Sequence, residues 1–227
     1  MADNRNSSNL IINRLTSSDF ARLQPELEPV DLPLRKVLEP RLKRIDAVYF
    51  MEDGFASVVS NGKMPIEVGV IGREGVTGIS ALLGIDRPPN ETFIQAAGRG
   101  QCIKMRTLRE ATKESATLQA LLLRYVHAFL QQTAKTAIAN GRSRIEQRLA
   151  RWLLMADDRI AAAELPLTHE FLAMMLGVRR PGVTIAIQQL ERDGLIARRR
   201  GTIVILDRDG LEKLAGSIYD GADFKWP

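Results

Sequence analysis

The side chains of this 227-residue chain that could do chemistry gather between positions 179 and 200. Six arginines lie in this segment against two carboxylates, those of Glu191 and Asp193, which leaves a local excess of four positive charges. The arginines are Arg179, Arg180, Arg192, Arg198, Arg199 and Arg200. The whole chain has a net charge of only +5, and from Arg144 to the end the charges nearly balance. A basic excess focused in one short segment is typical of a surface that faces phosphate groups.

Part of this segment is predicted to be a helix that presents polar side chains on one side. Pro181 suits its first turn, because a proline there lacks only an N–H that would have no partner within the helix. Val183, Ile187 and Leu190 form the buried stripe, and the side chains that project away from it are Arg179, Arg180, Thr184 and Gln188. Arginine can donate two hydrogen bonds to a guanine edge, and glutamine can do the same to adenine. The alternative is that Arg179 and Arg180 only hold phosphates.

Neighbouring elements must hold that helix in place, and the sequence predicts a helix-turn-helix followed by a wing. Thr168 is a good N-cap for a preceding short helix, and Gly177 is expected to end it because glycine accepts the left-handed conformation of helix C-termini. Two short helices around one tight glycine turn make a helix-turn-helix. Residues 195–206 predict two strands around an Arg200–Gly201 turn, which would form the wing. Asp209 and Glu212 then have capping-box spacing for a final helix.

The segment from about 27 to 105 has a different pattern. Short apolar or alternating runs at 30–34, 47–51, 55–59, 66–71, 92–96 and 101–105 are separated by Gly, Pro and Asn residues. Many short strands with such turns indicate an antiparallel sandwich or jelly roll. Asn61–Gly62 predicts a tight hairpin, because Asn-Gly tolerates the positive φ of a type I′ turn. Residues 1–20 are expected to be a polar tail that leads into a short helix capped within Thr16–Asp19.

A long helix is predicted after the strands, at 112–140, because its apolar residues recur in steps of three and four and it contains no proline. The stripe comprises Leu118, Leu122, Tyr125, Phe129 and Thr133, and neighbouring apolar residues broaden it. A stripe this wide needs two partners, so we expect the β domain on one side and a second copy of the helix on the other. The alternative is a single helix packed on its own domain. Gly141 is expected to end this helix, and another helix is expected over 144–160.

The pattern of the chain resembles the Crp/Fnr superfamily of bacterial transcription regulators. The residues that support the resemblance are Leu167-Thr168, Leu172-Ala173, Leu176-Gly-Val-Arg-Arg180, Val183-Thr184, Leu190-Glu191, Gly194-Leu-Ile196 and Arg200-Gly-Thr-Ile203. Residues 32–39 and 48–54 look like the family's N-terminal strands. The resemblance implies an α+β fold in three parts. These are an effector-sensing β jelly roll at 1–110, like a cyclic-nucleotide-binding domain, a dimerisation helix at 111–142 and a winged helix-turn-helix at 143–227.

The same resemblance implies a function. The chain is expected to be a sequence-specific, DNA-binding transcription regulator that acts as a homodimer on an inverted-repeat operator, with RNA polymerase as a further partner. Base reading is expected from Arg179, Arg180, Thr184 and Gln188, and Arg180 is the better match to the family's motif. Phosphate contacts are expected from Thr168, His169, Arg198, Arg199 and Arg200, although the wing arginines could instead form a solvated turn. Pro181 and Ile185 stand where the family often has an acidic reader and a second arginine, so a different operator sequence is expected.

An effector site in the β domain is constrained mostly by what the sequence lacks. Cys102 is the only cysteine, so a cluster held by four thiolates is excluded. Both histidines, His127 and His169, lie outside the β domain, which therefore lacks imidazole ligands for a metal. The segment Gly72, Arg73, Glu74, Gly75 resembles part of the family's cyclic-nucleotide pocket, but residues 95–97 offer no arginine and hydroxyl for the cyclic phosphate. Arg73, Arg87 or Arg99 could replace them. We expect a structural turn at this segment, no haem, metal or cyclic nucleotide, and an effector that the sequence does not identify.

Other classes of protein are disfavoured. The sequence contains no evident Ser/His/Asp or Cys/His arrangement, phosphate loop or pair of carboxylates in a glycine-framed site, so we expect no enzyme activity. A regulator that binds a protein partner through its β domain is another alternative, and the arginine-rich helix and wing favour DNA over it. The lone cysteine, the polar N-terminus and the lack of any apolar run of about 20 residues predict a cytoplasmic protein.

Overall fold

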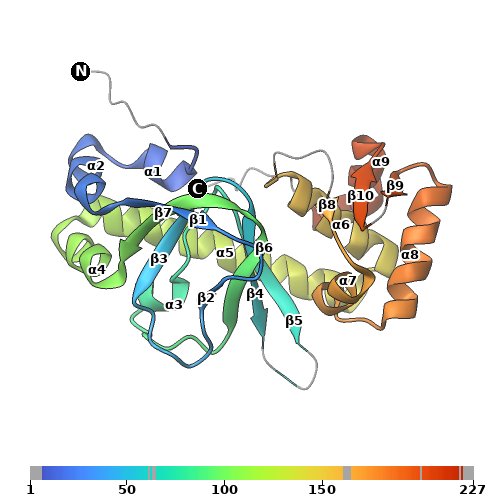
Figure 1. Ribbon diagram of the computed structural model, residues 1–227, viewed down its shortest axis with the longest axis horizontal. Coiled ribbons are helices and arrows are strands. Elements are labelled where there is room, and N and C mark those ends of the chain that lie inside the picture. Colours follow the sequence, from blue (N-terminus) through green and yellow to red (C-terminus); the bar gives the residue numbers. More distant parts are fainter. Residues whose placement is uncertain are drawn as a thin grey trace. The chain divides into compact units, whose positions relative to one another are not determined.

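The computed structural model of the chain (Figure 1) describes residues 7–60, 62, 65–160, 165–199, 201–219 and 221. Its residues form two compact units. The N-terminal unit comprises the described residues up to Val58 together with 70–131. The C-terminal unit comprises the described residues of 59–69 together with those from Gln132 onward. The predicted α+β class is confirmed, because a β-rich part is followed by a long helix and then by a winged helix-turn-helix.

Two sheets provide the strands of the predicted jelly roll. One contains β1 (Glu28–Leu32), β7 (Gly98–Lys104) and β3 (Ala47–Met51), in the order β1-β7-β3. The other contains β2 (Val37–Glu39), β6 (Glu91–Ala96), β4 (Phe55–Ser60) and β5 (Ile66–Ile71), in the order β2-β6-β4-β5. The pairs β1–β7, β3–β7 and β2–β6 are antiparallel. The predicted strands are therefore confirmed, and β2 lies within the segment 32–39 that resembles one of the family's N-terminal strands. Asn61 of the predicted hairpin turn lies outside the described residues.

Short helices cover the start of the N-terminal unit. They are α1 (Leu10–Arg14), α2 (Ser17–Leu23) and the 3-10 turn η1 (Gln24–Glu26), and α3 (Ile79–Leu82) and α4 (Met105–Glu114) follow later in the chain. The expected cap of α2 is confirmed, because the Thr16 hydroxyl accepts the N–H of Asp19. The expectation of a polar tail is wrong for the residues around α1. Asn9 caps this helix by accepting the N–H groups of Ile11 and Ile12, whose side chains are fully buried.

The predicted long helix is present as α5 (Ala116–Arg142), and it ends close to Gly141 as expected. It is separate from α4 because Ser115 has an extended backbone and its hydroxyl accepts the N–H of Leu118 at 3.2 Å. Burial disfavours the charge of Asp19, but the hydroxyls of Ser115, Thr117 and Thr16 donate to its carboxylate and hold its pKa below the ordinary value. These bonds fix α2 to the start of α5. Neither α5 nor another helix within the described residues is long and apolar enough to span a membrane.

The C-terminal unit contains the predicted winged helix-turn-helix. Its elements are α6 (Ile145–Asp157), β8 (Leu165–Pro166), α7 (His169–Leu176), α8 (Arg180–Arg192), β9 (Ile196–Arg199), β10 (Thr202–Ile205), α9 (Arg208–Ala215) and the 3-10 turn η2 (Gly216–Ile218). The strands pair in the order β8-β10-β9, so β8 adds a third strand to the wing. The predicted cap of α9 is wrong, because the helix begins after Asp207, whose carboxylate accepts the N–H of Gly210 at 2.9 Å. Asp209 lies within its first turn.

Candidate nucleic-acid interface

The predicted base-reading residues lie on α8, which packs against α6 and α7 in the C-terminal unit (Figure 1). The side chains of the contact face are fully buried, and they are Val183, Ala186, Ile187 and Leu190. Because an α-helix turns once in 3.6 residues, the opposite face presents residues 181, 185 and 188, and all three are exposed. Arg179 is the N-cap residue, Arg180 begins the helix, and both are exposed. The N-terminal half of α8 therefore faces outward, as the recognition helix of a helix-turn-helix does.

A short turn fixes α7 to α8. Thr168 caps α7 by accepting the N–H of Phe171 at 3.2 Å, which confirms the predicted N-cap. Gly177 ends α7 with a φ of +60°, in the left-handed region that favours glycine. The guanidinium of Arg148, on α6, donates to the carbonyl of Leu176 in the last turn of α7. The helix-turn-helix is therefore held by hydrogen bonds at both ends of α7 and by the packing of α7 and α8 against α6.

Two of the predicted DNA-contacting residues, His169 and Thr184, contact each other. The hydroxyl of Thr184 donates to the carbonyl of Arg180 at 3.2 Å, and Nδ1 of His169 lies 3.0 Å from the same hydroxyl oxygen. The tautomer of the His169 ring decides which of the two atoms donates in this hydrogen bond. The bond joins the start of α7 to the first turn of α8. Thr184 therefore has a positioning role within the chain besides any contact with a base.

Arg180 also has a partner within the helix-turn-helix. Its Nη1 atom lies 2.8 Å from Oε1 of Glu170, on the first turn of α7. Both side chains are 64% exposed, so the pair is screened by water and contributes little to stability. Sequence reasoning did not single out Glu170, because the two residues meet only when α7 and α8 are folded together. Arg180 is thus held near the outer face of the unit by a bond that can be broken easily.

The wing is tied to the end of α8 by Glu191. Its carboxylate accepts the backbone N–H of Arg198 at 3.0 Å and lies 2.7 Å from Nε of the same residue. Arg198 is therefore partly neutralised within the chain, and its first role is to position β9. Arg199 follows on the same strand and is exposed, and it pairs across the wing with Thr202. Arg200 lies outside the described residues.

A groove of about 260 Å³ lies between the start of α7 and the wing. Its lining residues are Leu167, Thr168, His169, Glu170, Arg180, Arg198, Arg199, Gly201, Thr202 and Ile203. The structure thus brings all the predicted phosphate contacts that it describes to one place. Three arginines border the groove against one carboxylate. A positive rim beside a helix N-terminus is favourable for a phosphate group, because the backbone N–H groups of the first turn point outward.

The predicted effector segment Gly72–Gly75 forms a tight turn in the N-terminal unit. The N–H of Gly75 donates to the carbonyl of Gly72 at 2.9 Å, and the N–H of Gly72 donates to the carboxylate of Glu74 at 3.1 Å. Glu74 is buried, and a Cβ atom on Gly75 would lie only 2.5 Å from the hydroxyl oxygen of Tyr125. Arg73 is exposed. This close packing favours the structural turn that the sequence predicts over a ligand pocket.

A buried carboxylate that sequence reasoning missed lies in the same unit. Glu39 is 5% exposed, and it accepts hydrogen bonds from the N–H of Gly78 and, at 3.2 Å, from the hydroxyl of Thr92. Burial raises the pKa of Glu39 in spite of these bonds. Burial also raises the pKa of the Cys102 thiol. Within the described part of the chain, no group of three or more His, Cys, Asp and Glu side chains is arranged to hold a metal ion.

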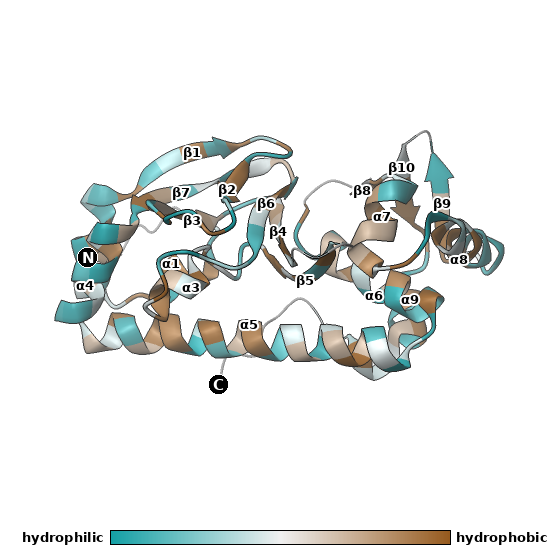
Figure 2. Ribbon diagram, turned by 90° about the horizontal axis from the view of Figure 1, so that it is seen from below, coloured by the Kyte–Doolittle hydropathy of each residue, from teal (hydrophilic) through white to brown (hydrophobic). Residues whose placement is uncertain are grey.

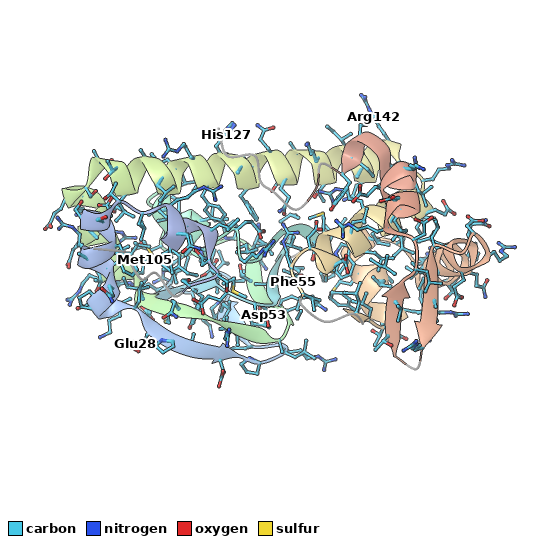
Figure 3. The ribbon with its side chains drawn as sticks, turned by 90° about the horizontal axis from the view of Figure 1, so that it is seen from above. Glu28, Asp53, Phe55, Met105, His127 and Arg142 are labelled. Carbon is cyan, nitrogen blue, oxygen red and sulfur yellow. The ribbon has the colours of Figure 1, made fainter. Side chains whose placement is uncertain are left out.

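Three of the five predicted dimer contacts on α5, those of Leu118, Leu122 and Tyr125, lie in the core of the N-terminal unit. Leu118, Leu122 and Tyr125 are at most 1% exposed and belong to the core of the N-terminal unit, Phe129 is 7% exposed, and Thr133 is half-buried. A side chain that its own core covers has no surface to offer a second copy. Figure 2 shows hydrophobic and hydrophilic residues alternating along α5. The large apolar residues exposed on α5 are Leu123 (43%), Leu130 (55%) and Ile138 (52%), and His127 projects from the helix between the first two (Figure 3).

The C-terminal unit matches a known family of domains. Residues 147–214, from α6 to α9, match the model of the Crp-like helix-turn-helix domain. No curated protein shows significant sequence similarity to the chain. The matched range contains α7, α8 and the wing, which are the elements that position the candidate DNA contacts.

Solved structures share the fold over most of the chain. A CRP-family transcriptional regulator from Thermus thermophilus has a TM-score of 0.70 at 20% identity, over 86% of this chain and 100% of that protein. FixK2 from Bradyrhizobium japonicum has a TM-score of 0.71 at 17% identity, over 84% and 98% of the two chains. A regulator of the Crp/Fnr family from Eubacterium rectale has a TM-score of 0.70 at 18% identity, over 92% and 98%. The chain therefore contains a Crp-like helix-turn-helix domain and has the fold of the Crp/Fnr transcription regulators.

Proposed function

We propose that the protein is a sequence-specific, DNA-binding transcription regulator. The observation that supports this most directly is the outward face of α8. Arg179, Arg180 and Gln188 are exposed there, opposite a stripe that is fully buried. Arginine and glutamine are the side chains that can make paired hydrogen bonds to guanine and adenine edges in the major groove. The match of residues 147–214 to a Crp-like helix-turn-helix domain supports the same conclusion.

In this proposal α8 and the wing have different tasks. The N-terminal half of α8 enters the major groove, and Arg180 leaves Glu170 to reach a base edge. The groove between α7 and the wing faces the DNA backbone, where Thr168, His169 and Arg199 contact phosphates. Arg198 contributes positive charge to this rim while it remains paired with Glu191. Contacts of the first kind select a sequence, whereas contacts of the second kind set the register on any duplex.

The active form is proposed to be a homodimer joined through α5. Leu123 and Leu130 expose apolar surface to water at a spacing of seven residues, which places both on one side of the helix. Pairing two copies of α5 about a two-fold axis would bury these side chains against each other. A two-fold dimer presents its two α8 helices in opposite directions, so the operator would be an inverted repeat.

The N-terminal unit is proposed to transmit a signal without binding a cyclic nucleotide at Gly72–Gly75, and the protein is proposed to have no enzyme activity. Residues 95–97 offer no arginine and hydroxyl for a cyclic phosphate, the Glu74 carboxylate is already bonded to the N–H of Gly72, and Arg73 is exposed. RNA polymerase is the proposed partner at the promoter. Calorimetry with cyclic AMP tests the ligand part: we expect no binding, and a submicromolar affinity would overturn it.

Selection of bound sites from a random DNA pool tests the DNA-binding proposal. We expect an inverted repeat whose half-sites are about one helical turn, roughly 34 Å, apart, because two recognition helices must enter successive major grooves on one face of the duplex. Removal of the α8 side chains by the triple change Arg179→Ala, Arg180→Ala and Gln188→Ala should abolish the selection. A pool that shows no enrichment with the unaltered protein, or equal enrichment with the triple variant, would contradict the proposal.

A further inference from the structure

The centre of the outward face of α8 is apolar. Ile185 is 59% exposed, and Pro181, one turn before it, is exposed as well. Both residues lie opposite the buried stripe through Val183 and Ile187, because they are displaced from it by about half a turn of the helix. Arg180 and Gln188 flank this pair along the helix. We call Pro181 and Ile185 the apolar ridge of α8.

The apolar ridge lies where base contacts are made if the proposed function holds. The N-terminal residues of a recognition helix are the ones that reach base edges in the major groove. A single exposed isoleucine elsewhere on a surface would need no explanation. At this position, however, a side chain that makes no contact with a base contributes nothing to the choice of sequence. The side chains of proline and isoleucine can neither donate nor accept a hydrogen bond, so any contact that they make with a base must be apolar.

The chemistry of the major groove leaves one feature that such a ridge can recognise. The edges of guanine, cytosine and adenine present hydrogen-bond donors and acceptors, whereas thymine also presents a 5-methyl group. Contact between this methyl group and an aliphatic side chain removes apolar surface of both from water. Cytosine at the same position would offer no methyl group and would place its amino group against the isoleucine without a hydrogen-bond acceptor.

We propose that the apolar ridge, and Ile185 above all, reads the 5-methyl group of a thymine in each half-site of the operator. This inference rests on the proposed function. It adds a specificity-determining residue that acts by apolar contact beside the hydrogen-bonding side chains of Arg180 and Gln188. It also names a base that the operator must contain within the stretch covered by the first two turns of α8.

Uracil substitution tests the proposal, because deoxyuridine differs from thymidine only in lacking the 5-methyl group. The selected operator is synthesised with each thymine replaced in turn by uracil, symmetrically in both half-sites, and the dissociation constants are measured. At one thymine position we expect uracil to weaken binding by about fourfold per half-site, or about fifteenfold for the pair, from the loss of one buried methyl group on each side. Ile185→Ala should bind the thymine and uracil operators with nearly equal affinity.

The matched control is Leu206→Ala. Leu206 is 62% exposed, like Ile185, but it lies after β10, and its N–H donates to the carbonyl of Leu195, beyond the C-terminal end of α8. This variant should therefore keep the full uracil effect. Ile185→Val provides a second, smaller change and should reduce the uracil effect without removing it. An effect of equal size in Ile185→Ala and the unaltered protein would overturn the proposal, as would operators in which no thymine is sensitive to uracil. If the unaltered protein selects no operator at all, the proposed function itself fails.

Discussion

The carboxylate of Glu170 lies 2.8 Å from the guanidinium of Arg180, so the first turn of α7 holds the side chain at the start of α8. A guanidinium has five N–H donors, so Nε and Nη2 of Arg180 can still donate a pair of hydrogen bonds to a guanine while Nη1 is bound to Glu170. Because both side chains are exposed, breaking the pair costs little. Glu170 also places a negative charge on the surface that faces DNA in the proposed complex, where it opposes the approach of phosphates.

The first prediction follows from this charge. Glu170→Gln should bind DNA more tightly by several-fold, for the selected operator and for random duplex alike, since an exposed pair of this kind is worth about 0.2–1 kcal/mol and a repulsive charge is removed as well. Titrations of both duplexes at low and at physiological salt would measure the effect. If operator binding instead weakens while random duplex binding is unchanged, Glu170 orients Arg180 for base reading.

A second prediction contrasts α8 with the wing. Arg180→Ala should cost about 1–3 kcal/mol on the operator and relax the preference at one base pair, because the hydrogen bonds to a base edge are removed. Arg199→Ala should weaken all sequences nearly equally and reduce the salt slope by about one for each phosphate that is no longer neutralised, because binding to phosphates releases counterions. Affinities on operator and mismatched duplexes across a salt series would measure both.

The contrast between these two variants is the informative result. If Arg180→Ala lowers only the salt slope and leaves the preferred sequence unchanged, Arg180 binds a phosphate, and base reading falls to Arg179, Gln188 and the apolar ridge. If neither variant changes DNA binding, the winged helix-turn-helix is not the functional surface.

The helix-turn-helix could be predicted from the sequence because its signals are local. Thr168 and Gly177 act within one turn of the helix that they begin and end, and the stripe through Val183 repeats with the period of the helix itself. The strands of the jelly roll could be found for a similar reason, since glycine, proline and asparagine mark the turns between them.

The features that were missed depend on pairing between distant residues. β8 is a strand only because Leu165 pairs with Ile203 of β10. A segment of two residues is too short to show the alternating pattern by which a strand is recognised in a sequence. Glu170 on α7 pairs with Arg180 on α8, and Glu191 near the end of α8 pairs with Arg198 on β9. Each pair joins two elements, so it forms only once they are folded together. The apolar stripe of α5 is wide enough to pack against two neighbours, the core of its own unit and a second copy of the helix. The residue types in the stripe do not indicate which of them are buried in the core. The structure assigns Leu118 and Leu122 to the core and leaves Leu123 and Leu130 outside.

A third prediction concerns the pH dependence of stability. Burial raises the pKa of Glu39, so in the window between its ordinary and its raised pKa the folded state keeps a proton that the unfolded state has released. The free energy of unfolding therefore falls as the pH rises through this window and stays lower above it. Glu39→Gln removes the titrating group and keeps an oxygen to accept the N–H of Gly78.

Thermal unfolding from pH 5 to pH 8 would measure this effect. We expect the Tm of Glu39→Gln to exceed that of the unaltered protein by a few degrees at neutral pH, with the difference shrinking toward acid. Thr92→Val, which removes one of the hydroxyl bonds to Glu39, is the matched change and should lower the Tm at neutral pH. A Glu39→Gln variant that is less stable at every pH would mean that the charged carboxylate is favoured in the folded protein.

The last prediction concerns the dimer, and it separates the two faces of α5. Replacing both Leu123 and Leu130 by glutamate should give folded monomers at micromolar concentration, because the charges would face each other across the proposed two-fold axis without disturbing the core. Leu122→Ala is the matched change on the buried face. It should cost about 2–5 kcal/mol of stability, because it leaves a cavity in the core, but the folded fraction should remain dimeric. Sedimentation velocity reports the mass of each variant, and circular dichroism reports whether it is folded.

If the double glutamate variant sediments as a dimer, the two copies meet elsewhere, and the inverted repeat would then have to be explained by another interface. A folded Leu122→Ala monomer would mean that the buried face of α5 contributes to the interface, as the sequence predicts, and would require the helix to rotate against its own core when the two copies pair.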